Sequence, residues 1–237
     1  MTLPSSPSPT PRPRALFPSL PRPVHAVIFD MDGLLIDTER HVRTATLAAA
    51  ETVGKPMTDA YYVTVIGTPW PETWRRLKQW FGGEEEARRF RAAFEQEVER
   101  HLAEVRLMAG VEELLAALDA AGLPLAVATS TRRAKAEEHL AQVGILHRFR
   151  LLVTGDEVSQ GKPHPEPYLT AAARLGVDPA HCLALEDSHN GIRAAHGAGM
   201  MAVMVPDLLP ATEEIRALCQ LVAPDLHAVR GLLAALD

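Results

Sequence analysis

The sequence has few cysteines and no long apolar run. Its two cysteines, Cys182 and Cys219, cannot build a disulfide scaffold and lack the spacing of a zinc site. We therefore expect a reducing, cytoplasmic compartment. No apolar run reaches the ~18 residues of a membrane span, so we predict no membrane partner.

Positive charge is also scarce. The 237 residues carry 24 Lys plus Arg against 30 Asp plus Glu, a formal charge of −6. Residues 1–24 hold three arginines and no acid, which leaves −9 on the remainder. Nucleic-acid-binding proteins usually carry a basic surface, so we predict no nucleic-acid partner. An anionic phosphate ester would need a focused positive site on this chain, and a metal ion would help to provide one.

The first 23 residues contain eight prolines together with Ser and Arg. They lack the apolar segment of a secretory signal, and proline removes backbone donors and favours extended conformations. We predict a disordered leader over residues 1–23. The total length suits one domain with a sizeable insertion, or two small domains.

Short apolar runs alternate with helical patterns along most of the chain. Such alternation is typical of a parallel β-sheet with helices on both faces. The expected strands are residues 24–30, 123–128, 151–154, 182–185, 201–205 and a segment near 221–222. The helices expected between and after them are 111–121, 132–142, 165–175, 191–198 and 226–236.

One interval breaks this alternation. Residues 38–104 contain no convincing buried strand, whereas segments 43–53, 71–81 and 84–101 show helical patterning. We predict a helical domain over 38–104, inserted after the first strand. Residues 24–37 and 105–237 would then form the α/β core.

Polar residues follow the expected strands where ligands bind in open α/β sheets. They provide carboxylates, hydroxyls and one ammonium group: Asp30, Asp32, Thr129, Ser130, Lys162, Glu186 and Asp187. Clustered carboxylates repel one another, and a hard divalent cation such as Mg²⁺ is the simplest remedy. A carboxylate beside such a cation can attack phosphorus, as aspartyl-phosphate enzymes do.

The same residues divide naturally into chemical roles. Asp30 and Asp187 suit a magnesium site that keeps several waters. Lys162 and the Thr129 hydroxyl would offset charge on phosphoryl oxygens. Asp32 follows two residues after Asp30, where it could protonate a leaving alcohol and later deprotonate water.

Four segments resemble the four motifs of the haloacid dehalogenase superfamily, in the family's order. They are Phe29-Asp-Met-Asp-Gly-Leu-Leu-Ile-Asp-Thr38, Ala128-Thr-Ser130, Gly161-Lys-Pro163 and Leu185-Glu-Asp-Ser188. The subgroup that the chain resembles has a helical cap after the first motif. It contains β-phosphoglucomutase-like proteins and small sugar-phosphate or nucleotide phosphatases. The resemblance implies a Rossmann-like core, Mg²⁺ and an aspartyl-phosphate intermediate.

The resemblance also implies residue roles. Asp30 resembles the nucleophile and a metal ligand, and Asp32 the general acid/base and a metal ligand through its carbonyl. Asp187 matches the second metal carboxylate, with Glu186 beside it as a partner of the metal or of its water. Phosphate binding falls to the side chains and backbone amides of a further set: Thr129, Ser130, Lys162, Gly33 and the amide near Asp32.

Phosphate monoester hydrolysis is the preferred reaction, and a β-phosphoglucomutase-like phosphomutase is the alternative. Mutases of the family carry Gly-x-x-Arg in the cap, whereas here Ile66-Gly-Thr-Pro-Trp70 places Trp where that Arg would stand. A catalytically silent phosphate- or metal-binding module is the alternative from another class, and the complete set of acids argues against it. Asp32 disfavours a dehalogenase, and Lys55 and Lys78 do not clearly match the cap lysine of a phosphonate hydrolase.

The cap should set specificity, and its candidate contacts are weaker predictions. His41, Arg75, Arg76 and Arg132 are candidate substrate contacts, although each also suits a solvated or structural position. The aromatic residues between Tyr61 and Trp80 suit cap packing better than a sugar or base site. Asp37-Thr38 is expected to start the first cap helix. We predict a small phosphorylated metabolite as the substrate, and a monomer or weak dimer as the working form.

Overall fold

The computed structural model describes residues 20–65, 70–101 and 105–232, so most of the predicted leader lies outside the described residues. Six parallel strands form one sheet in the order β3-β2-β1-β4-β5-β6. Their bounds are β1 (Ala26–Phe29), β2 (Leu125–Ala128), β3 (Leu151–Val153), β4 (Cys182–Glu186), β5 (Met201–Met204) and β6 (Leu221–Val222). The predicted α/β class with a parallel sheet is confirmed.

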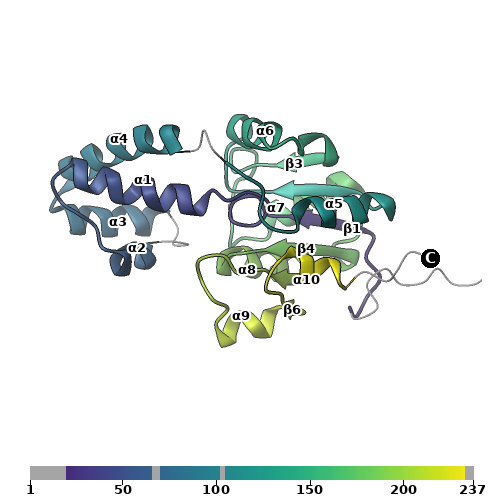
Figure 1. Ribbon diagram of the computed structural model, residues 1–237. Coiled ribbons are helices and arrows are strands. Elements are labelled where there is room, and N and C mark those ends of the chain that lie inside the picture. The colour runs from purple at the N-terminus through teal and green to yellow at the C-terminus, as the bar shows by residue number, and fades with distance from the viewer. Residues whose placement is uncertain (1–19, 66–69, 102–104, 233–237) are drawn as a thin grey trace, which may run out of the picture.

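Helices connect the strands and cover the sheet (Figure 1). They are α1 (Glu39–Thr52), α2 (Asp59–Val65), α3 (Trp70–Phe81), α4 (Glu84–His101), α5 (Val111–Ala120), α6 (Arg133–Gln142), α7 (Glu166–Leu175), α8 (His189–Gly197), α9 (Glu213–Leu218) and α10 (Leu226–Arg230), with 3₁₀ turns η2 (Leu146–Arg148) and η3 (Pro179–His181).

Successive side chains of a strand point to opposite faces of the sheet. The central strands are buried on both faces, because helices cover each face. Val27 and Phe29 of β1 join a core cluster that includes α5 and α10 residues such as Leu115 and Val229. Ile28 joins the opposite cluster, which includes residues of α7, α8 and α9. Full burial of a Leu, Ile or Phe side chain is worth about 1.5–3 kcal/mol, so these two clusters hold the helices on the sheet.

The sheet order determines where a ligand can bind. Phe29 pairs with Val127 of β2 on one side and Leu185 of β4 on the other. The chain connections leave β1 and β4 in opposite directions across the sheet, which opens a crevice at their carboxyl ends. The residues that follow β1 and β4 therefore face one another at this switch point.

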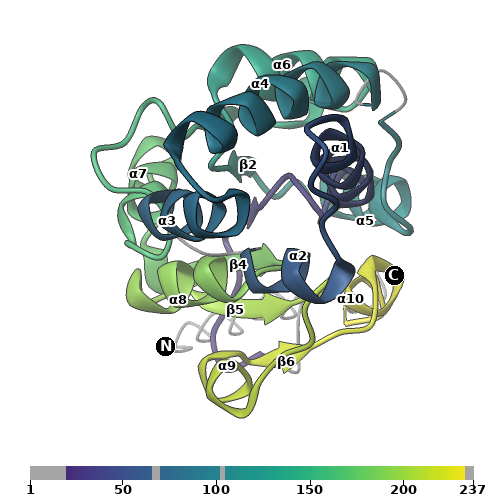
Figure 2. The same ribbon diagram turned by 90° about the vertical axis from the view of Figure 1, so that its left-hand side faces the viewer.

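Helices α1–α4, here called the helical insertion, lie beyond the carboxyl end of β1 (Figures 1 and 2). They have their own core, in which the Phe81 and Phe90 rings stack with centroids 4.5 Å apart. Leu208, from the segment after β5, packs against the same core. The insertion is thus in contact with the rest of the protein near the strand ends.

Several predicted elements need correction. The helices α2 and α9 were not expected from the sequence, because each is short and buries few residues, such as Tyr62 in α2 and Ile215 in α9. Helix α1 begins at Glu39, directly after Thr38, as expected for the Asp37-Thr38 pair and ahead of the helical patterning predicted over 43–53. Helix α10 ends at Arg230, and residues 233–236 of the predicted helix lie outside the described residues.

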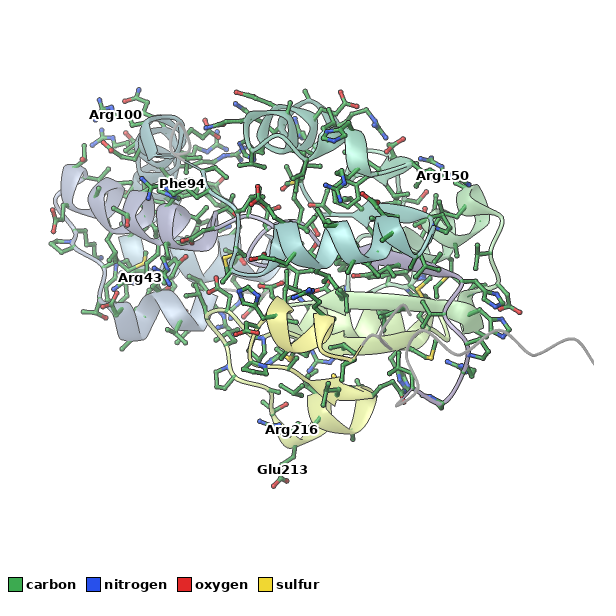
Figure 3. The ribbon with its side chains drawn as sticks, turned by 45° about the vertical axis from the view of Figure 1, so that its right-hand side comes forward. Arg43, Phe94, Arg100, Arg150, Glu213 and Arg216 are labelled. Carbon is green, nitrogen blue, oxygen red and sulfur yellow. The ribbon has the colours of Figure 1, made fainter. Side chains whose placement is uncertain are left out.

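Many charged side chains project into solvent. Figure 3 shows Arg150, Glu213 and Arg216 pointing outward from the core, and Arg100 outward from the helical insertion. Within the described ranges, no helix combines the length and the apolar character needed to cross a membrane.

Candidate active site

The carboxyl ends of β1 and β4 bring three acids together. Asp30 follows β1 and is only 7% exposed, whereas Glu186 ends β4 and is fully buried. The amide of Asp30 donates to the carbonyl of Leu185, which ties the two strand ends together. One carboxylate oxygen from each of Asp30, Glu186 and Asp187 lies within 4.8 Å of the others. We call this group the acidic rim.

Lys162 binds two members of the rim at once. Its Nζ lies 2.5 Å from Asp30 Oδ1 and 2.5 Å from Glu186 Oε1, and its side chain is 6% exposed. The lysine comes from the loop between β3 and α7, so residues far apart in sequence meet here. Charge-assisted hydrogen bonds of this kind are short and strong, and they offset much of the cost of burying these charges.

The buried charges shift one another's protonation. Burial raises the pKa of Asp30 from 3.8 to about 7. The negative charges of Glu186 and Asp32 also raise this pKa, whereas the positive charge of Lys162 lowers it. Burial would lower the pKa of Lys162, but Asp30 and Glu186 outweigh it and hold that pKa above its ordinary value. The ammonium group therefore stays charged.

Three hydroxyl groups orient Asp32. Thr38 Oγ1 donates to Asp32 Oδ1 over 2.9 Å, and Thr131 Oγ1 donates to Oδ2 over 2.7 Å. Thr129 Oγ1 lies 3.3 Å from the same Oδ2 and accepts a bond from the Thr131 amide. The Thr129 hydroxyl, predicted to bind phosphate, thus contacts Asp32 in this structure.

Glu186 has donors on both carboxylate oxygens. Tyr168 donates to Oε1 over 2.7 Å, beside Lys162. The Ser188 amide and hydroxyl both donate to Oε2, over 3.2 Å and 3.0 Å. A Cβ on Gly191 would lie 1.8–2.1 Å from this carboxylate, so only glycine leaves room for it. Ser188 also caps α8, as its oxygen accepts from the Gly191 amide.

Glycines shape the loops that follow β1 and β3. Gly33 has a φ of 79°, which favours glycine, and its amide donates to the carbonyl of Ile36. In this structure the Gly33 amide therefore bonds within the loop, and its contact with phosphate stays a prediction. A Cβ on Gly155 would stand 2.2 Å from the carbonyl oxygen of Ser130, so the β3 end packs directly on the exposed Ser130.

The predicted cap residues do not join the acidic rim. Arg75 and Arg76 both bond to Glu72 of α3, over 2.6 Å and 2.7 Å, and Arg76 also donates to the Thr64 carbonyl. His41 lies half-buried on α1, and Arg132 is exposed at the start of α6.

The aromatic side chains of the insertion mainly pack together. Tyr61 stacks on Trp80 with centroids 4.0 Å apart, and its hydroxyl donates to the Arg76 carbonyl. Tyr62 lies in the insertion's core. The side chain of Trp70 and residues 66–69 fall outside what the structure describes, so the Gly-x-x-Arg comparison is not tested there.

The sheet order and the lysine held between buried acids define an open α/β protein with its site at the switch point of the sheet. The model of the haloacid dehalogenase-like hydrolase family matches residues 27–205. The chain belongs to this family and is an enzyme of its hydrolase type.

Known proteins support this assignment. A phosphorylated carbohydrates phosphatase of Thermotoga maritima is 36% identical over 75% of this chain and 82% of its own length. Hexitol phosphatase B of Escherichia coli is 32% identical over 79% of this chain and 86% of its own. Among solved structures, the β-phosphoglucomutase of Clostridium difficile superposes with a TM-score of 0.70 at 25% identity, covering 86% of this chain and 92% of that one.

Sequence reasoning missed three residues that support the site. Thr131 and Tyr168 bond to Asp32 and Glu186, and Gly155 leaves room for the Ser130 carbonyl. Thr131 directly follows the second motif, which is a signal that could have identified it. The other two act through tertiary contacts that no local pattern indicates.

Proposed function

We propose that this enzyme is a Mg²⁺-dependent phosphatase that hydrolyses a small phosphate monoester through a phosphorylated Asp30. The observation that carries the proposal is the Lys162 ammonium held between buried Asp30 and Glu186, beside Asp187. The alcohol would be a sugar or a polyol, as the names of the carbohydrate and hexitol phosphatases suggest, or a nucleoside, as in a probable pseudouridine-5'-phosphatase of Drosophila melanogaster that the chain also resembles.

The acidic rim fits a magnesium ion by its chemistry. Its ligand atoms are carboxylate oxygens, the hard donors that Mg²⁺ prefers, and they lie close enough together to share one ion. Asp30 and Asp187 would bind it directly, with the Asp32 carbonyl and Glu186 as further ligands or partners of its waters. When bound, the ion supplies positive charge that offsets the rim and the phosphoryl oxygens.

The proposed reaction has two steps. The Asp30 carboxylate forms a bond to phosphorus while the bond from phosphorus to the alcohol oxygen breaks, and Asp32 gives that oxygen a proton. Asp32 next takes a proton from water, whose oxygen attacks phosphorus and releases phosphate and the Asp30 carboxylate. Lys162 and the Thr129 hydroxyl hold the phosphoryl oxygens throughout, together with the Ser130 amide.

We further propose that residues 38–104 act as a cap on a core formed by 24–37 and 105–237. The insertion lies beside the strand ends, where closure would exclude water from the phosphorylated aspartate. His41 and Arg132 remain candidates for substrate contacts. The two cysteines favour a cytoplasmic enzyme, and the acidic charge of −6 disfavours a nucleic-acid partner. We also propose that it has no membrane partner and works as a monomer or weak dimer.

A phosphomutase is the second candidate, favoured by the structural likeness to the Clostridium difficile β-phosphoglucomutase. A mutase must bind a second phosphate in its cap. Arg75 and Arg76 are both engaged by Glu72, which draws their charge away from such a phosphate. Hydrolysis is therefore the better-supported reaction.

Two experiments test the proposal. Asp30→Asn should lose nearly all Mg²⁺-dependent phosphate release from a panel of sugar, polyol and nucleoside monophosphates, because an amide cannot attack phosphorus. Wild-type turnover by this variant would refute the assigned nucleophile. Incubation of the wild type with β-glucose 1-phosphate and a bisphosphate primer separates the two reactions, since a mutase would form glucose 6-phosphate in preference to free phosphate.

A further inference from the structure

Tyr168 is the largest of the fully buried side chains that the structure describes, and it lies directly against the site. Its hydroxyl donates to Glu186 Oε1 over 2.7 Å. The Lys162 ammonium stands over its ring, with Nζ 5.2 Å from the ring centroid. One residue of α7 thus contacts two charged groups of the site, although the chemistry above gives it no part.

The hydroxyl of Tyr168 is one of four donors that hold the Glu186 carboxylate. Tyr168 and Lys162 share Oε1 of Glu186, while Ser188 binds Oε2 through its amide and hydroxyl. These bonds fix the carboxylate in one orientation.

That orientation matters because of the geometry of an ammonium group. Lys162 Nζ has three N–H donors, and its bonds to Asp30 and Glu186 use two of them. The direction of the third follows from the positions of these two acceptors. A shift of Glu186 Oε1 would therefore change the direction of the third donor.

We propose that Tyr168 is a positioning residue of the phosphate site, whose hydroxyl holds Glu186 Oε1 and whose ring supports Lys162, so that the ammonium group points at the phosphoryl oxygen. This inference rests on the proposed phosphate site. It adds the uncharged Tyr168, which determines the orientation of Glu186 and Lys162 toward the phosphate.

Tyr168→Phe tests the hydroxyl alone, since the ring is kept. The full chain with Mg²⁺ is titrated with inorganic phosphate by calorimetry, and kcat/KM is measured on the best ester of the panel. A hydrogen bond to a charged group is worth about 1.5–3 kcal/mol, so phosphate affinity and kcat/KM should each fall about tenfold or more. Mg²⁺ affinity without phosphate should change less than about threefold, as Ser188 still holds Glu186.

Two further variants separate positioning from packing. Tyr62→Phe removes the hydroxyl of a tyrosine that is 4% exposed in the core of the insertion, and it should keep wild-type phosphate affinity. Tyr168→Leu also removes the ring and should bind phosphate more weakly than Tyr168→Phe. Equal phosphate affinity in the Leu and Phe variants would refute the role of the ring.

The result that overturns the proposal is equally specific. Phosphate affinity of Tyr168→Phe within twofold of the wild type would show that the hydroxyl does not position Lys162. A parallel loss of thermal stability, Mg²⁺ affinity and phosphate affinity would show a packing role instead. If the wild type hydrolyses no ester, the proposed function fails, yet the comparison of phosphate affinities still decides the role of Tyr168.

Discussion

The Thr38 hydroxyl donates to Asp32 Oδ1 over 2.9 Å, although Thr38 occupies the position before the first turn of α1. Threonine at that position usually caps the helix with its side-chain oxygen. Here no side-chain capping bond forms, and the buried hydroxyl turns toward the site instead. The start of the helical insertion is thereby linked directly to the predicted general acid/base.

This link predicts the effect of Thr38→Val, which keeps the shape of the side chain and removes the donor. Asp32 would lose one of its hydroxyl partners and its fixed orientation. Because a hydrogen bond to a charged group is worth about 1.5 kcal/mol or more, kcat/KM for phosphate esters should fall about tenfold. Steady-state assays provide the measurement.

Thr44→Val is the matched control for this variant. Thr44 also lies in α1, and its hydroxyl donates only to the Arg40 carbonyl among the bonds that the structure describes. Its loss should leave kcat/KM unchanged. If the Thr38 and Thr44 variants behave alike, the bond to Asp32 has no catalytic importance.

The raised pKa of Asp30, about 7, predicts a pH-dependent affinity for Mg²⁺. Below that pKa the carboxyl group is protonated and must release its proton before it can bind the ion. The apparent affinity should therefore rise up to tenfold per pH unit as the pH approaches 7 from below, and level off above it. Calorimetric titration with Mg²⁺ between pH 5.5 and 8.5 measures this.

The same titrations include two internal checks. Proton release on Mg²⁺ binding, measured in buffers of different ionisation enthalpy, should be largest below pH 7 and vanish well above it. Asp30→Asn should remove the pH dependence. An affinity that stays constant from pH 5.5 to 7 in the wild type would contradict the raised pKa.

The sequence indicated the parts of the site that are local in the chain. Short apolar runs predicted β1 and β4, and the polar residues after them include Asp30 and Glu186, because parallel strands end at one edge. No local pattern could place Tyr168 under Lys162, or show that Thr38 bonds to Asp32 rather than capping α1. Those contacts depend on how the loops pack after the sheet has formed.

The same limit applies to the short elements. Helix α2 is seven residues long and contains Val63 and Val65, whose β-branched side chains do not favour a helix. Its buried Tyr62 and Val65 pack into the core of the insertion, so tertiary contacts stabilise it. Propensity alone would not have identified this helix.

Gly191 predicts an unusual response to alanine. In a helix interior, Gly→Ala ordinarily stabilises by about 0.5–1 kcal/mol. A methyl group at position 191 would instead meet the Glu186 carboxylate at 1.8–2.1 Å and displace it from its donors. Gly191→Ala should lower both phosphate affinity and thermal stability, as measured by calorimetry and thermal unfolding.

Gly197 of the same helix is the control. Its added methyl group would meet Pro165 at 3.7–3.9 Å, which is ordinary van der Waals contact. Gly197→Ala should therefore be neutral or slightly stabilising, with unchanged phosphate affinity. A neutral outcome at position 191 as well would mean that Glu186 can move without loss, which would contradict its fixed orientation.

Lys162→Met predicts a stability loss that depends on pH. Removing the ammonium group leaves the charges of Asp30 and Glu186 buried without it, and breaking a buried pair in this way costs about 3–5 kcal/mol. The loss should be larger at pH 8 than at pH 5.5, because Lys162 lowers the pKa of Asp30 to about 7 and its removal lets Asp30 take up a proton already above that pH. Urea unfolding at pH 8 and pH 5.5 with a chelator measures the difference. Lys135→Met, which breaks an exposed pair with Glu138, should leave the free energy of unfolding almost unchanged at either pH, because solvent screens such a pair. Equal losses for Lys162→Met at the two pH values would show that Asp30 does not take up the proton.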